Sequence, residues 1–128
     1  MIAALAFSYL GACKGIEILE NLSLLGQEVT NKLTKLCKEY AIPCAPISVV
    51  TGDIIAEDWS DADIIFAASV CFSNELMELF ADRCGQLKKG TRILFMNYLP
   101  ERPYIEEVAS MRGNFTWGLH LLRYYVLV

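Results

Sequence analysis

Two acidic residues follow apolar runs that are typical of strands, and both can contact a nucleoside. Glu17 lies within the run Lys14–Leu19, near its end, and Asp53 comes just after the run Ile47–Thr51. An acid at a strand end commonly accepts hydrogen bonds from ribose hydroxyls in nucleotide-binding α/β folds. A carboxylate or carbonyl at Asp53 can accept a hydrogen bond from an exocyclic adenine amine. The neighbouring Ile54 can press on a flat ring.

Both acids also have ordinary structural explanations. Glu17 can be a solvated acid or a partner of Lys14. Asp53 follows Gly52, and a Gly-Asp pair is common in turns. Taken alone, these residues leave nucleoside binding and a structural role open.

The segment Ala68–Phe72 leaves a predicted strand and leads into a helix that Ser73 can cap. In an α/β enzyme such a loop faces the substrate. Cys71 is a candidate nucleophile, but no recognisable residue supplies its base, so a core thiol is favoured. Ser69 lacks the GxSxG context of a hydrolase.

Several common kinds of site have little support in the sequence. The five cysteines form no CxxC pair, and there is one histidine, so no metal site or disulfide framework is predicted, and free buried thiols are favoured. His120, in an apolar run, suits packing better than general-base catalysis. Trp59 and Trp117 suit a core or a lid better than base stacking. No GxG pattern or P-loop follows a strand.

The spacing of apolar residues predicts alternating helices and strands. This alternation favours an α/β layered fold with a mainly parallel sheet, in which ligands bind outside the carboxyl ends of the strands. Those ends include Asn97 as well as the acids and the loop. Strands are predicted at 14–19, 47–51, 61–68, 91–97 and 115–128, and helices at 1–11, 21–40, 73–90 and, as a short one, 105–111.

The composition predicts one globular domain in an intracellular protein. Of 128 residues, 55% are hydrophobic and 20% are charged, which excludes a disordered chain. The net charge of −4 argues against general electrostatic binding to nucleic acid or anionic membrane. The apolar opening Met1–Cys13 falls short of the roughly 20 residues needed to cross a bilayer. It also lacks the basic start of a signal peptide.

Four blocks together resemble the second half of a class I S-adenosylmethionine-dependent methyltransferase. They are KGIEIL, TGDII, DADIIFAASVCFSNELMELF and LKKGTRILFMN. The chain is most similar to histone-lysine methyltransferases of the disruptor-of-telomeric-silencing type, from about Met1 to Asn97 and more loosely to Val128. The resemblance implies a Rossmann-like sheet with flanking helices and S-adenosylmethionine as cofactor. Residues 1–128 would be the C-terminal part of the methyltransferase domain.

The resemblance also implies a role for each candidate residue. The two acids would hold the ribose and the adenine amine, and the isoleucine would cover the adenine face. The loop would lie near the methyl group and the target side chain, although Ala-Ser stands where the family usually has asparagine. The implied cofactor-binding residues are Glu17, Asp53, Ile54 and Ala68, and the implied catalytic residues are Ser69 and Phe72.

The family's first strand and its glycine-rich turn have no counterpart here. In the family that strand lies between those at Gly15–Leu19 and Asp63–Ala68, so its absence would expose two rows of backbone groups. Unpaired buried amides cost about 1–3 kcal/mol each, and open edges invite aggregation. We therefore expect a truncated product, an incomplete gene model or a fragment completed by another chain, which can be a second copy. Without the glycine-rich loop the chain alone is expected to be inactive.

The favoured function is methyl transfer to a protein, in particular to a histone lysine. That function implies a protein substrate and a nuclear location, or a cytoplasmic one if the substrate is not a histone. No direct nucleic-acid site and no membrane contact are expected. Two alternatives stay open: a non-catalytic interaction domain derived from a methyltransferase, and a methyltransferase for a small molecule or a non-histone protein. A receiver or flavodoxin-like domain is a weaker third, since no acid cluster or phosphate loop is evident.

Overall fold

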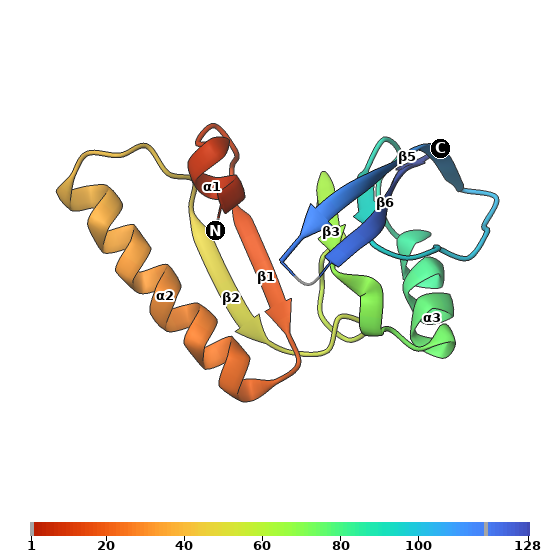
Figure 1. Cartoon of the computed structure of the whole chain (residues 1–128), viewed down its shortest axis with the longest axis horizontal. Helices are drawn as coiled ribbons and strands as arrows, with labels where there is room; N and C mark the ends of the chain where they lie inside the picture. The colour runs from red at the N-terminus through yellow and green to blue at the C-terminus, as the bar shows by residue number, and fades with distance from the viewer. Residues whose placement is uncertain (1, 117) are drawn as a thin grey trace. The chain divides into compact units, whose positions relative to one another are not determined.

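The computed structural model describes residues 2–116 and 118–128, and it forms two compact units (Figure 1). The first unit ends at Glu57 and the second begins at Asp58. Each unit is described by itself. Met1 and Trp117 lie outside the described residues, so the prediction for that tryptophan and the first residue of the predicted helix 1–11 are not addressed.

The first unit is a two-stranded parallel sheet with one long helix packed on it. Its elements are α1 (Ile2–Ala6), β1 (Cys13–Glu17), α2 (Glu20–Glu39) and β2 (Ile47–Thr51). The strand register runs from Cys13 opposite Ile47 to Glu17 opposite Thr51. A side chain at Gly26 would lie 3.3 Å from Val49, so the glycine lets α2 approach β2 closely. The predicted strand 47–51 and helix 21–40 are confirmed.

Helix α2 ends in a left-handed turn that returns the chain toward the sheet. Ala41 has a φ of +53°, and the Ile42 amide donates to the Cys37 carbonyl over 2.8 Å. This bond spans the last turn, as it does in a Schellman cap. Pro43 and Pro46 then hold the backbone extended, which prevents further helix.

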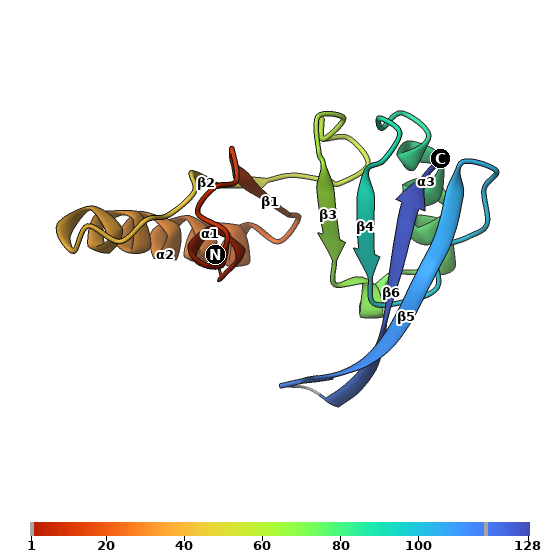
Figure 2. The same ribbon diagram turned by 90° about the horizontal axis from the view of Figure 1, so that it is seen from above.

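The second unit is a four-stranded mixed sheet packed with one helix. Its elements are β3 (Ile64–Ala67), the 3-10 helix η1 (Ser69–Cys71), α3 (Asn74–Cys84), β4 (Arg92–Phe95), β5 (Ile105–Phe115) and β6 (Gly118–Leu127). The strand order is β3-β4-β6-β5. β3 and β4 are parallel, whereas β6 is antiparallel to both of its neighbours. In Figure 2, β5 and β6 continue past the ends of β3 and β4.

Large aromatic side chains fill the core of the second unit. Trp59 stacks on Phe80 with ring centroids 5.3 Å apart, and Phe80 lies 5.2 Å from Phe95. Ile93 and Leu99 are buried beside the sheet. The prediction that Trp59 is a core residue is therefore confirmed.

Three predictions about the elements are wrong. Residues 105–111 form strand β5 rather than a helix, because pairing with β6 overrides the helix propensity of the Glu and Ala residues in this segment. Helix α3 ends at Cys84 with Gly85 as its cap, so Lys88–Gly90 belong to a turn before β4. The first helix stops at Ala6 and does not reach residue 11. The chain is a mixed α/β protein, as predicted. The predicted single, mainly parallel sheet is not what the described residues form: they form two sheets, and β6 pairs antiparallel with both of its neighbours.

Candidate functional site

The carboxyl ends of β1 and β2 bring Glu17 and Asp53 to one edge of the first unit's sheet. Glu17 is paired with Thr51 in the parallel register, and the Gly52 amide donates to the Glu17 carbonyl over 3.0 Å. Asp53 is the next residue along the chain. Glu17 is half-buried and Asp53 is exposed. The predicted placement of both acids at neighbouring strand ends is thus what the structure has.

Each of the two carboxylates uses one oxygen to hold the local backbone. The Glu17 Oε1 atom accepts from the Leu19 amide over 2.9 Å, just before α2 begins. The Asp53 Oδ1 atom accepts from the Ile55 amide over 2.8 Å in the turn after β2. The second oxygen of each carboxylate has no hydrogen bond to another described residue. Both acids therefore have a structural role and a remaining acceptor that a ligand can use.

A hydrogen bond between two hydroxyls fixes the end of β2 against α2. The Thr51 hydroxyl donates to the hydroxyl of Ser23 over 2.7 Å, and Ser23 is fully buried. The Gln27 side-chain amide donates to the same Ser23 oxygen over 3.3 Å. These bonds hold the strand end from which Asp53 emerges.

Sequence reasoning missed Glu57, a third carboxylate beside this strand end. Asp53 organises the turn, since its carbonyl accepts from the amides of Ala56 and Glu57. The turn brings the half-buried Glu57 side chain against Gly52, where any side chain would collide with the carboxylate. The Gly-Asp pair predicted the turn, but nothing in the sequence indicated that the Glu57 side chain folds back onto Gly52. Ile54 is half-buried within the same turn.

The segment Ala68–Phe72 leaves β3 in the second unit through the short helix η1. Ala68 is exposed, whereas Ser69 is fully buried and its Oγ atom has no hydrogen-bond partner among the described residues. The Phe72 ring is half-buried and meets the Phe95 ring edge-on, with centroids 6.1 Å apart. The predicted cap is confirmed, because the Ser73 hydroxyl accepts from the Leu76 amide.

The six predicted site residues therefore fall into two groups. Glu17, Asp53 and Ile54 belong to the first unit, and the structure brings the two acids to one edge. Ala68, Ser69 and Phe72 belong to the second unit and follow one strand. One group presents polar acceptors and the other is mainly apolar.

Comparison with known families places both groups within one sequence pattern. The family model of Histone methylation protein DOT1 matches residues 1–116. The chain belongs to this family. The match spans nearly all of the chain and runs through both units, so it includes all six predicted site residues. No curated protein matches the DOT1-family chain.

The cysteines and the histidine of this DOT1-family chain differ in burial. All five cysteines are free. The core thiol predicted at Cys71 is wrong, because this residue ends η1 and is exposed. Burial raises the pKa of Cys84 to about 12. His120 is half-buried, with its ring 6.2 Å from that of Phe115, consistent with packing.

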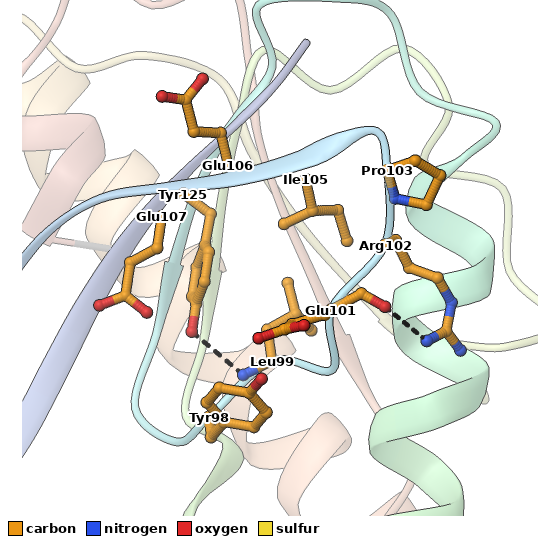
Figure 3. A pocket seen from close by; sticks show the side chains of 9 residues that line it. All are labelled: Tyr98, Leu99, Glu101, Arg102, Pro103, Ile105, Glu106, Glu107 and Tyr125. Carbon is orange, nitrogen blue, oxygen red and sulfur yellow. Dashed lines mark hydrogen bonds between the residues drawn. The ribbon is translucent and has the colours of Figure 1, made fainter.

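A cavity of about 570 Å³ lies in the second unit (Figure 3). The Leu99 amide donates to the Tyr125 hydroxyl across its floor over 3.1 Å. Burial and the nearby Glu101 raise the pKa of Tyr98. The cavity contains none of the six predicted residues; it is lined by Tyr98, Leu99, Glu101, Arg102, Pro103, Ile105, Glu106, Glu107 and Tyr125.

Residues 2–116 and 118–128 can also be described by their possible metal ligands and by the length and apolar character of their helices. No group of three or more His, Cys, Asp or Glu side chains in these residues is arranged to hold a metal ion. Within the same residues, no helix is both long enough and apolar enough to cross a membrane.

Proposed function

We propose that this DOT1-family chain is part of an S-adenosylmethionine-dependent methyltransferase in which Glu17 and Asp53 hold the adenosine of the methyl donor. One observation carries the proposal: two strand-end carboxylates lie at one sheet edge, and within residues 2–116 and 118–128 only one oxygen of each accepts a hydrogen bond. Such acceptors match the hydroxyl and amine donors of a nucleoside.

The remaining donor-site roles follow from the same edge. The free Glu17 oxygen accepts from the ribose hydroxyls, and Asp53 accepts from the exocyclic amine through its carboxylate. The half-buried Ile54 covers one face of the adenine ring. Ser23 and Thr51 keep the end of β2 in place, which limits the cost of ordering the site on binding.

The bound donor supplies an activated methyl group on a sulfonium, which a nucleophile displaces in line. The protein must then position donor and acceptor, and proximity and orientation can account for roughly 7–11 kcal/mol of the barrier. We assign the acceptor channel to Ala68–Phe72. The fully buried Ser69 and the packed Phe72 ring keep this segment ordered. Its apolar character suits a neutral lysine amine, because burial disfavours the ammonium form.

The proposed acceptor is a histone lysine, which would place the protein in the nucleus. The family match supports histone methylation, and the lysine is the finer step of the proposal. The substrate is then a protein, and the net charge of −4 suits a basic partner better than nucleic acid.

The proposal also treats residues 1–128 as the C-terminal part of one Rossmann-like methyltransferase domain. One family model runs through both units, which supports a single domain. In the described residues β1 and β3 each have a parallel neighbour on one side only, so each can accept a further strand on its free edge. Another segment of the protein or a second chain would supply such a strand.

A non-catalytic interaction domain is the second candidate, and the loop after β3 favours it. Ala68 offers no polar side chain, and the Ser69 hydroxyl is buried away from solvent. A loop of this kind can retain the fold without contacting a reacting nitrogen.

Isothermal titration of the natural full-length protein with S-adenosylmethionine tests the donor site. We expect Glu17→Gln and Asp53→Asn each to weaken binding by roughly tenfold or more, as for loss of a charge-assisted hydrogen bond. Glu39→Gln, at the far end of α2, is the matched control and should bind as the unaltered protein does. Absence of binding, or binding that ignores both substitutions, contradicts the donor site.

Transfer of a labelled methyl group to purified histones separates the two candidates. Labelled lysine supports the methyltransferase, whereas the absence of transfer to any histone, other protein or small molecule supports the interaction domain. Labelling of a small molecule or a non-histone protein alone would overturn the histone proposal and keep the donor site.

A further inference from the structure

Two thiols meet where α2 ends, on a part of the first unit that the proposed function does not use. Cys37 lies in the last turn of α2 and is only 6% exposed. The left-handed residue Ala41 and the bond from the Ile42 amide to the Cys37 carbonyl turn the chain back. Cys44 follows this turn and is half-buried. The turn thus returns the second thiol to the helix that carries the first.

The two side chains line one cavity. This cavity of about 450 Å³ is formed by the end of α2 and the segment before β2, and it includes Lys38 and Ile42. The Cys44 thiol donates to the Ala45 carbonyl over 3.4 Å. Burial and the neighbouring Cys44 raise the pKa of Cys37. The Cys37 thiol therefore ionises less readily than a solvent-exposed thiol.

We propose that Cys37 and Cys44 form a reversible intramolecular disulfide when the chain meets a low-molecular-weight disulfide such as oxidised glutathione. The better exposed Cys44 thiolate attacks one glutathione sulfur, which forms a mixed disulfide and releases one glutathione thiolate. The Cys37 thiolate then attacks the Cys44 sulfur and releases the second glutathione. Two protein thiols are oxidised and one glutathione disulfide is reduced to two thiols, so electrons and protons balance.

The arrangement makes this pair distinct from the other cysteines. Cys84 is fully buried, and its raised pKa disfavours the reactive thiolate. Cys71 is exposed but belongs to the second unit. Cys13 is half-buried at the start of β1, where its amide donates to the Pro46 carbonyl. The disulfide would tie the end of α2 to the segment entering β2, at the opposite end of the strands from Glu17 and Asp53. The inference is therefore independent of the proposed function.

The test is equilibration of the full chain with oxidised and reduced glutathione, followed by alkylation and peptide mass spectrometry without reduction. Trypsin cuts after Lys38, so the two cysteines fall in separate peptides unless a disulfide joins them. We expect the linked peptides, at a mass lower by two hydrogen atoms than their sum, and their release by reduced glutathione. Cys71→Ser is the matched control and should keep the link, since that residue shares a tryptic peptide with Cys44.

Cys44→Ser should abolish the link and leave Cys37 slow to alkylate in the folded chain. This residue is half-buried, so the variant is expected to fold. A second measurement does not require a variant: one phenylarsenoxide should bind per chain and protect both thiols from alkylation. The proposal is overturned by a stable mixed disulfide at Cys44 with Cys37 still reduced, by a link from Cys44 to Cys13, or by independent alkylation of both thiols.

Discussion

The two units of the chain bury very different side chains. In the first unit the buried residues are small: Ala4, Ser23, Thr30, Cys37 and Ala45. In the second, the core contains large apolar and aromatic side chains: Trp59, Phe80, Ile93, Phe95, Met96, Leu99, Tyr125 and Leu127. Meanwhile α2 of the first unit leaves several large apolar side chains exposed: Leu22, Leu24, Leu25, Val29 and Leu36. Among the described residues, the large buried apolar side chains therefore belong to the second unit.

The candidate site residues follow the same division. The acids Glu17 and Asp53 belong to the unit with the small buried residues, where hydrogen bonds such as that from Thr51 to Ser23 hold the strand end. The loop Ala68–Phe72 belongs to the unit with the aromatic core, and Phe72 packs on it. Polar acceptors thus lie where packing is light, and the apolar loop lies where packing is dense.

Truncating one large apolar side chain in each unit, one buried and one exposed, should give the largest contrast. Phe95 is fully buried and contacts Phe80 and Phe72, so Phe95→Ala should lower the free energy of unfolding by about 3–5 kcal/mol. Leu25 is 55% exposed, and Leu25→Ala should cost less than about 1 kcal/mol. Urea unfolding followed by circular dichroism measures both. Equal losses would show that the α2 leucines are covered in solution, and the comparison would fail.

A smaller effect should come from one hydrogen bond in the second unit. The Tyr125 hydroxyl accepts from the buried Leu99 amide, so Tyr125→Phe leaves that donor without a partner. The expected loss is about 1–3 kcal/mol. Tyr104→Phe is the control: the Tyr104 hydroxyl donates to the Ala81 carbonyl, and because Tyr104 is only half-buried its loss should cost less. Urea unfolding measures both variants. A larger loss of unfolding free energy for Tyr104→Phe than for Tyr125→Phe would contradict the importance of the bond to the Leu99 amide.

Local patterns predicted α2 and β2 of the first unit well. The helix 21–40 follows from its apolar spacing, and the two prolines after it explain its end. The strand 47–51 is rich in β-branched residues and is bounded by Gly52. These two elements depend on residues close together in the chain. The proximity of Glu17 and Asp53 could be predicted for another reason, because the carboxyl ends of parallel strands meet at one edge.

Features that depend on distant residues could not be predicted in this way. Taken alone, the sequence of residues 105–111 is typical of a helix. These residues form part of strand β5 because they pair with β6. The burial of Ser69 and the exposure of Cys71 depend on how η1 turns over the second unit's core. Similarly, Glu57 joins the strand end only because Gly52 leaves space for its side chain.

An alkaline pH series should sharpen the contrast between buried and exposed thiols. Burial raises the pKa of Cys84 from its ordinary value of 9.0 to about 12. The folded chain therefore keeps a proton that the unfolded chain loses, so stability is full below pH 9 and falls as the pH rises toward 12. We expect a loss of up to about 1.4 kcal/mol between pH 9 and 10 from this group. Cys84→Ala should flatten this decline in urea titrations, whereas Cys71→Ser should leave it unchanged. A decline of equal slope in both variants would assign it to other groups.

The smallest effect is expected for an exposed ion pair on α2, because solvent screens the interaction between its charges. The Lys32 ammonium lies 2.6 Å from the Glu28 carboxylate one helical turn away, and this contact lowers the pKa of Glu28 below 4.5. A lowered carboxyl pKa contributes stability above the unfolded value, and that contribution is lost as the pH falls through the folded value. Lys32→Met should return the Glu28 pKa toward 4.5, as measured by NMR titration of the side-chain carboxyl. Lys35→Met, on the same helix, is the control and should shift the Glu28 pKa less.

Because both charges of the Lys32–Glu28 pair are mostly exposed, raising the salt concentration should remove most of the difference in Glu28 pKa between the unaltered chain and Lys32→Met. A difference that persists in high salt would mean that this face of α2 is covered.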